Sequence, residues 1–441
     1  MAGIAEDKIL VLEFGTYSIK LKVGTDDVGS LPNLEIRSQI GIPSDLLTSV
    51  EEEDAPRSKR ISDENLKNAF TEGKLVLGSE LTKYFSADKP SAEKGPIKVF
   101  DTLNEDGIID WSCLKLLLIH LLVCELEIAL DDNDSALLVA VPLSWPKVDL
   151  EHLSQLCFEN LNSPALFILP QPLATLYGYG VSNGLVVDIG YSSTKLTPII
   201  DCCVIGYGHS TLAFGTKDFD ELLLEYILGN TELQSTFSEV KLDLDLVQYL
   251  REAGHLSFIK KEGVLNDGSS RVSPSKSNFD LAQNTVKIEY NGTTIQVKEA
   301  LLEVSECVFA TSLKNMPSLA QQLIDGIFRA IERCDPEKRS LLWDNIALSG
   351  GFSCAKGLGK SLEQALQARM PITENSGLSQ STPIKVTPMP EYFSKWKGNP
   401  HLATMLGSTI TAKYVFQDPK LHITKLDYSE SGPLIIHNKS A

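Results

Sequence analysis

The sequence is short of basic residues and has no long uninterrupted apolar run. Only 40 lysines and arginines stand against 58 aspartates and glutamates in 441 residues, a formal net charge of −18. So acidic a surface argues against direct binding of DNA or RNA, because phosphate backbones attract clustered basic side chains. The longest apolar stretch, 114–123, is interrupted by Lys115 and His120 and is shorter than the ~20 residues that cross a bilayer. We therefore expect no membrane association and at most indirect contact with nucleic acid.

Metal-binding and redox motifs are missing as well. The eight cysteines show no CxxC spacing, and the seven histidines form no evident triad or metal pattern. The adjacent Cys202 and Cys203 are more typical of two buried thiols than of a redox device, which favours a reducing compartment. The N-terminus lacks both a basic start and a sustained apolar run, so no signal peptide is predicted. These features predict a soluble intracellular protein.

Two copies of one predicted β-hairpin stand far apart in the chain, at 9–23 and 184–199. In each copy an apolar β-branched run ends on an acidic residue, and a glycine, a small polar tip and a second strand follow. The residues that coincide, first copy then second, are Glu13 and Asp188, Gly15 and Gly190, Ser18 and Ser193, and Lys20 and Lys195. The duplication indicates two related α/β halves.

Each hairpin has a plausible phosphate-binding chemistry. A carboxylate at the strand end can hold a hydrated cation, while glycine lets backbone N–H groups approach a phosphate. A single copy would be interpreted as an ordinary β-hairpin with a polar turn. Because the same residue types recur in the same order, the two loops are better interpreted as a clamp for a nucleotide tail.

The remaining patterns alternate between strands and helices. Asp110 is a natural N-cap for an apolar helix that follows it, and 136–142 reads as a buried strand. Asn291-Gly292 predicts the turn of a further hairpin over 286–297. The segments 46–96 and 265–278 are rich in charge, serine and proline and are predicted to be solvated.

Taken together, these features resemble the actin superfamily over nearly the whole chain. Residues 12–20 and 187–195 resemble its two phosphate loops, and 346–353 resembles its adenosine-binding segment. The ending, 423–439, is very close to that of conventional actin, and hexokinases and Hsp70 chaperones lack it. The resemblance implies an α/β, actin-like fold of duplicated RNase H-like halves, in two lobes with insertions.

The resemblance also implies domain bounds. Residues 1–178 would form the first half, with 36–96 as an inserted outer segment. Residues 179–382 would form the second half, with 215–317 inserted, and 383–441 would return to the first half.

A nucleotide site is implied at the hairpins and the glycine pair. Its possible contacts are Gly15, Thr16, Lys20, Asp188, Gly190, Gly350 and Gly351. Glu13 and Asp188 would be the candidates for magnesium. Gln171 matches the glutamine that positions attacking water in the family, or it simply caps a helix or hydrogen-bonds near the hinge.

Several residues depart from the family's pattern. Glu13 replaces an aspartate, and its extra methylene moves the carboxylate by ~1.5 Å, enough to disturb the octahedral shell of magnesium. Tyr17 and Tyr191 put bulky rings at the two loop tips, and Phe352 stands where actin has threonine. The polar pair of the outer insertion is missing around 251–255. We therefore expect a protein that is not an enzyme, with Gln171 a vestige, and that requires no cofactor, ATP and magnesium being possible ligands only.

Among nuclear actin-related proteins, the chain is most similar to the actin-related protein 9 class of fungal SWI/SNF and RSC chromatin remodellers. The motifs are at 144–151, 188–201 and 390–397. This resemblance implies a nuclear subunit without catalysis that acts through protein–protein interaction in transcription regulation. It would form a heterodimer with a second actin-related protein.

The same resemblance implies that the pair binds the basic helicase-SANT-associated helix of a Snf2-type remodelling ATPase, among other remodeller subunits. An acidic surface suits such a helix, and chromatin and its nucleosomes would be reached only indirectly. The alternatives are a nucleotide-binding actin-type ATPase or filament-forming protein, and a subunit of another nuclear assembly of INO80, SWR1 or histone acetyltransferase type.

Overall fold

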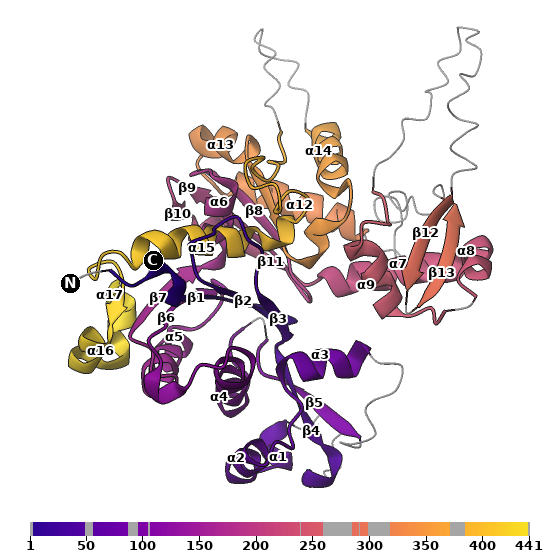
Figure 1. The fold of residues 1–441 in the computed structure, drawn as a ribbon. Coiled ribbons are helices and arrows are strands. Elements are labelled where there is room, and N and C mark those ends of the chain that lie inside the picture. The colour runs from indigo at the N-terminus through magenta and orange to yellow at the C-terminus, as the bar shows by residue number, and fades with distance from the viewer. Residues whose placement is uncertain are drawn as a thin grey trace, which may run out of the picture. The chain divides into compact units, whose positions relative to one another are not determined.

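The computed structural model describes residues 3–48, 56–86, 96–104, 106–238, 240–258, 285–290, 292–298, 318–370 and 384–439 (Figure 1). By its internal contacts the chain divides into two compact units. The first unit contains residues 1–178 and 403–441, and the second contains residues 179–402. Both units combine sheets with packed helices, so the predicted α/β class is confirmed.

A six-stranded mixed sheet forms the centre of the first unit. Its strands, in spatial order, are β15 (Ile423–Thr424), β7 (Ala165–Pro170), β6 (Ala136–Val141), β1 (Ile9–Phe14), β2 (Ser18–Val23) and β3 (Leu34–Arg37). The neighbours β1, β6 and β7 run parallel, whereas β2, β3 and β15 run antiparallel to the strands they join. Every residue of β1 and β6 is buried, as expected for strands covered on both faces.

Helices cover both faces of this sheet. Alternate residues of β1, such as Leu10 and Leu12, join a core with α4 (Trp111–His120) and α5 (Lys147–Gln155), in keeping with the two-residue period of a strand. On the other face α15 (Ala403–Val415) packs against β1 and β6.

A close helix crossing holds α15 in place. At Gly407 a Cβ atom would clash with the Ala174 carbonyl of α6 (Gln171–Tyr179). Only a residue without a side chain allows the two backbones to approach this closely.

The outer insertion of the first unit is better packed than its composition predicts. Its described elements are β4 (Gln39–Pro43), α1 (Arg57–Arg60), α2 (Asp63–Thr71), α3 (Gly78–Ser86) and β5 (Ile97–Asp101). Leu66, Leu77 and Leu81 are fully or almost fully buried. The prediction of a solvated segment over 46–96 is therefore wrong for its described part. Apolar residues spaced among the charges give these helices a buried face.

The second unit repeats the strand plan of the first. Its main sheet has the order β10 (Cys203–Val204), β9 (Thr194–Ile200), β8 (Gly184–Ile189) and β14 (Ile346–Ser349), with β11 (Ser210–Leu212) also paired to β9. The hairpin β8–β9 is antiparallel and β8 runs parallel to β14. The first unit has the same arrangement, since β1 pairs with β2 antiparallel and with β6 parallel.

Helices pack on this second sheet as well. The long helices α7 (Thr216–Gly229) and α12 (Leu319–Glu332) contribute to one core with β8 and β9. The further elements are α8 (Thr231–Thr236), α9 (Leu244–Glu252), α13 (Arg339–Trp343), α14 (Leu358–Arg369), and the hairpin β12 (Thr285–Tyr290) with β13 (Thr293–Lys298).

Some sequence-based expectations fall at the edge of what is described. The segment 265–278 and the turn residue Asn291 lie outside the described residues. Residues 384–402 belong to the second unit by their contacts, so the chain returns to the first unit at Ala403 rather than at residue 383. Among the described residues, no helix combines the length and the apolar character needed to cross a membrane.

The C-terminal segment is fixed by one carboxylate. Asp427 in α16 (Lys425–Ser431) accepts hydrogen bonds from the backbone N–H and hydroxyl of Thr424, at 2.9 and 2.7 Å. It also accepts from the Lys439 ammonium of α17 (Ile436–Lys439), at 2.8 Å. Burial alone would raise the pKa of Asp427, but these hydrogen bonds lower it to about 2.

Because the pKa of Asp427 is lower in the folded protein than its ordinary 3.8, its stabilisation should be complete above pH ~4 and disappear as the pH falls toward 2. We expect Asp427→Asn to accelerate hydrogen exchange of the α16 amides about fivefold at pH 6, which corresponds to the ~1 kcal/mol of a helix cap. The difference should vanish near pH 2. Glu430→Gln, at an exposed position of the same helix, is the control. An effect of Asp427→Asn that persists unchanged at pH 2 would contradict this assignment.

Candidate functional site

The first loop carries an ion pair between its two strands. The β1–β2 register places Glu13 directly opposite Lys20. The Lys20 Nζ lies 3.0 Å from the Glu13 Oε1, and the two side chains are only 14% and 11% exposed. A charge-assisted hydrogen bond in so dry a setting is stronger than the same pair in water. The carboxylate proposed to hold a cation therefore already has an ammonium group beside it.

The tip of the first loop is tied to the segment around β3. The Ser18 hydroxyl donates to the Glu35 carboxylate at 2.5 Å. Ser38 donates from its N–H to the Tyr17 carbonyl and from its hydroxyl to the Thr16 carbonyl, at 3.2 and 2.8 Å. These contacts fix the loop backbone.

Tyr17 does not stand alone at this tip. Its half-buried ring lies beneath the Arg37 guanidinium, 3.9 Å from the ring centroid to Cζ. Such a cation–π contact holds the ring against β3. Removing the ring from the loop tip would cost this contact.

Gln171 connects two strand ends. Its side-chain Nε2 donates to the Phe14 carbonyl at 2.5 Å and lies 3.4 Å from the Ala140 carbonyl. Phe14 ends β1 and Ala140 belongs to β6, so the amide crosses from α6 to both strands. The hydrogen bond thus links the start of α6 to the end of β1. The first unit thus brings Glu13, Gly15, Thr16, Lys20 and Gln171 together.

The second loop repeats the register of the first. Asp188 lies opposite Lys195 across the β8–β9 hairpin, as Glu13 lies opposite Lys20. The N-terminus of α7 closes on its tip, because Thr216 donates from its N–H to the Gly190 carbonyl at 2.7 Å. Tyr191, next in the loop, is 39% exposed. The ring therefore extends from the tip rather than into the core of its unit.

The predicted glycine pair lies directly against this loop. Gly350 follows β14 with a φ of 80°, a conformation that favours glycine. A Cβ atom there would clash with the Ile189 carbonyl and lie 2.6 Å from the Asp188 Oδ1. Gly350 therefore determines how closely β14 approaches the end of β8. The second unit brings together Asp188, Gly190, Gly350 and Gly351.

Two charged residues that the sequence analysis did not select hold this glycine segment. Arg251 of α9 is 2% exposed and pairs with Asp220 of α7 through two hydrogen bonds, at 2.9 and 3.1 Å. Its third nitrogen donates to the Gly351 carbonyl at 2.7 Å. One signal in the sequence was available: each is a charged residue on a helix face that is otherwise apolar.

Burial dominates the electrostatics of this pair. It raises the pKa of Asp220 above its ordinary value, against the attraction of Arg251. Burial also works to lower the pKa of Arg251, but the charge and hydrogen bonds of Asp220 outweigh it and the pKa is raised. At neutral pH we infer an ionised pair, because both oxygens of the carboxylate face the guanidinium.

The side chain of Phe352 belongs to the core of the second unit. Its ring is fully buried, stacked on Phe219 at 4.2 Å and edge-to-face with Phe258 at 5.4 Å between centroids. Where actin has threonine, this chain therefore has an extension of its core. The aromatic cluster and the Arg251 pair together fix the position of the glycines.

The residues of the first loop fit a magnesium nucleotide poorly. Its carboxylate is paired with Lys20, and its Ser18 hydroxyl donates to Glu35. A magnesium ion at this carboxylate would lie beside the Lys20 ammonium, and the two positive charges would repel each other. Across the described residues, no cluster of three or more histidine, cysteine, aspartate or glutamate side chains could hold a metal.

Comparison with known proteins identifies the class. A family model described as Actin matches residues 4–441, so the chain belongs to the actin family, and the predicted actin-like fold is confirmed. The chain is similar to Actin-related protein 7 from Arabidopsis thaliana, with 25% identity over 371 residues. That alignment covers 83% of this chain and 93% of the relative. Similarity to an actin-related protein is thereby established.

The buried pair should behave as a unit when mutated. We expect Asp220→Leu or Arg251→Met alone to lower the free energy of unfolding by about 3–5 kcal/mol, because each leaves one buried charge without its partner. The double variant should lose much less than the sum of the two. Denaturant unfolding of the four proteins measures this coupling. Strictly additive losses would show that the two side chains do not stabilise one another.

Proposed function

We propose that this chain is a non-catalytic actin-related subunit of an ATP-dependent chromatin-remodelling complex, of the actin-related protein 9 class found in SWI/SNF and RSC assemblies. It works in the nucleus, in transcription regulation. It pairs with a second actin-related protein and binds the helicase-SANT-associated helix of a Snf2-type ATPase. Its contact with nucleosomes is through these partners.

The proposal that the chain is non-catalytic is supported by the contacts within the first loop. Glu13 and Lys20 neutralise each other at 3.0 Å, and the tip is fixed by Ser38. Gln171 donates its amide N–H to the Phe14 carbonyl at the end of β1. In this proposal Gln171 is a structural vestige, and neither ATP nor magnesium is required.

The charge of the chain supports a basic helix as partner. A net charge of −18 favours association with a lysine- and arginine-rich segment and speeds the encounter between the two. It disfavours direct binding to DNA, since like charges repel. Chromatin is therefore reached through the ATPase that carries the helix.

The relative supports the actin-related branch of the family. Its name, Actin-related protein 7, is that of an actin-related protein and not of a conventional actin. A nuclear subunit is our extension of that similarity. The actin-related protein 9 class rests on the motifs at 144–151, 188–201 and 390–397.

A nucleotide-binding actin-type ATPase is the second candidate. It is favoured by the second loop, where Asp188, Gly190 and Gly350 lie together as an actin-type loop requires. A subunit of an INO80, SWR1 or histone acetyltransferase assembly is a third possibility. It differs from the main proposal only in which partner chains are present.

Affinity purification of the tagged full chain from its native cells tests the assignment. We expect a Snf2-type ATPase and a second actin-like chain to copurify in equal amounts with it. The matched control is the same ATPase with its helicase-SANT-associated helix deleted, from which this chain should be lost while other subunits remain.

Three results would contradict the proposal. Retention on the helix-deleted ATPase would exclude that helix as the binding site. Recovery with INO80, SWR1 or acetyltransferase subunits would move the chain to another assembly. Recovery as a filament, or as a free monomer with no partner, would favour the second candidate.

A further inference from the structure

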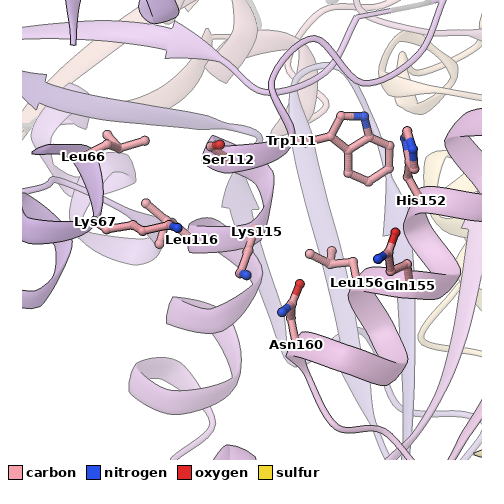
Figure 2. A pocket seen from close by; sticks show the side chains of 10 residues that line it. All are labelled: Leu66, Lys67, Trp111, Ser112, Lys115, Leu116, His152, Gln155, Leu156 and Asn160. Atoms are coloured by element: carbon pink, nitrogen blue, oxygen red, sulfur yellow. The ribbon is translucent and has the colours of Figure 1, made fainter. Parts of the chain in front are cut away.

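A pocket of about 390 Å³ lies within the first unit, between α2, α4 and the end of α5 (Figure 2). It is separate from the loop residues described above. Buried leucines form its apolar part, namely Leu66 of α2, Leu116 of α4 and Leu156 just after α5. Its volume is within the range of ~300–1,000 Å³ typical of small-molecule sites.

An aromatic wall stands on one side of the pocket. Trp111 is the first residue of α4, and its ring meets the His152 ring edge-on, with centroids 5.2 Å apart. Figure 2 shows these two rings next to each other above Gln155 and Leu156. The indole is half-buried, so one part of it remains open to a ligand.

Two lysines supply the charge. Lys67 is exposed and Lys115 half-buried, and both line the pocket, Lys115 lying centrally in the view of Figure 2. No carboxylate lines it. The carboxylate that interacts electrostatically with Lys67, Asp63 of α2, lies outside the pocket lining and pairs with Arg57 at 2.6 Å. The two lysines that line the pocket are thus its charged side chains. In a chain of net charge −18, this is a local reversal of sign.

Two further carboxylates adjoin the pocket in sequence and are held by other groups. Asp110, which caps α4, pairs with the Arg57 guanidinium at 2.6 and 2.8 Å. Glu159, beside Asn160, accepts from the Tyr428 hydroxyl at 2.8 Å and from Gln155 at 3.1 Å. Because no carboxylate lines the pocket itself, the two lysines are the charged groups that a ligand there would contact.

We propose that this pocket binds a small amphiphilic anion, a carboxylate or a phosphate ester that carries an aromatic or aliphatic group. The leucines and the Trp111 ring receive the apolar group. The anionic head pairs with Lys67 and Lys115, which make charge-assisted hydrogen bonds. An apolar molecule without a charge would contact only the leucines and Trp111, and a bare anion would contact only the lysines.

Fluorine NMR of the full chain labelled with 5-fluorotryptophan provides a direct test. Of the four tryptophans, Trp145, Trp343 and Trp396 are buried, so only the Trp111 resonance should respond to a ligand in this pocket. Trp111→Phe identifies that resonance. We expect phenyl phosphate and 4-phenylbutyrate to shift it saturably, with dissociation constants of about a millimolar, as for other small fragments.

Matched variants separate this site from general surface binding. Lys67→Gln/Lys115→Gln should weaken the binding of both compounds about tenfold, by loss of two charge-assisted contacts. Lys147→Gln/Lys420→Gln removes the same charge from exposed positions outside the pocket and should leave binding unchanged. Inorganic phosphate and 4-phenylbutanol, which each lack one half of the ligand, should shift the resonance much less.

The outcomes that overturn the proposal are specific. A Trp111 resonance that stays fixed with both compounds excludes the site. Equal shifts from inorganic phosphate or from the neutral alcohol would refute the amphiphilic requirement. Equal weakening by the two pairs of lysine variants would indicate unspecific attraction. Response only to a capped peptide of aspartate, glutamate and phenylalanine would instead assign the pocket to a partner chain.

Discussion

The structure depends on a duplicated cross-strand register that places a lysine directly opposite the acidic residue at the end of a buried strand. Glu13 faces Lys20 in the first unit and Asp188 faces Lys195 in the second. In the first unit the two side chains join at 3.0 Å, largely out of water. That pairing joins the two strands of the hairpin and gives the Oε1 atom of Glu13 a partner within the protein.

Neighbouring side chains make further contacts with each loop. In the first unit Ser38, Arg37 and Gln171 contact the loop or the strand end beside it. In the second unit the buried Arg251 fixes the Gly351 carbonyl, and Gly350 sets the approach of β14 to β8. Polar groups that could have met a ligand are thus held by neighbours. Because buried polar groups are costly when unpaired, such contacts stabilise the backbone of each loop.

Much of the fold could be predicted from the sequence, because the two hairpins repeat in one order and the strands carry continuous apolar runs. The helix N-cap at Asp110 and the buried strand that begins at Ala136 were predicted for local reasons of the same kind. Contacts between distant segments could not be predicted. The pairing of Arg251 with Asp220, the packing of Tyr17 under Arg37 and the stacking of Phe352 on Phe219 each join residues that are distant in the chain. Composition predicted a solvated segment over 46–96, but its described helices bury a face of spaced leucines despite the many charged residues.

Titration of the purified full chain with magnesium ATP, after removal of any carried nucleotide, tests most directly whether the loops have become a scaffold. Calorimetry reports the stoichiometry, and phosphate release in the same samples reports turnover. The account predicts no one-to-one binding and no release of phosphate above the rate in buffer, because the Lys20 ammonium lies beside the Glu13 carboxylate where the magnesium ion would bind. Binding of one nucleotide per chain with steady phosphate release would contradict it.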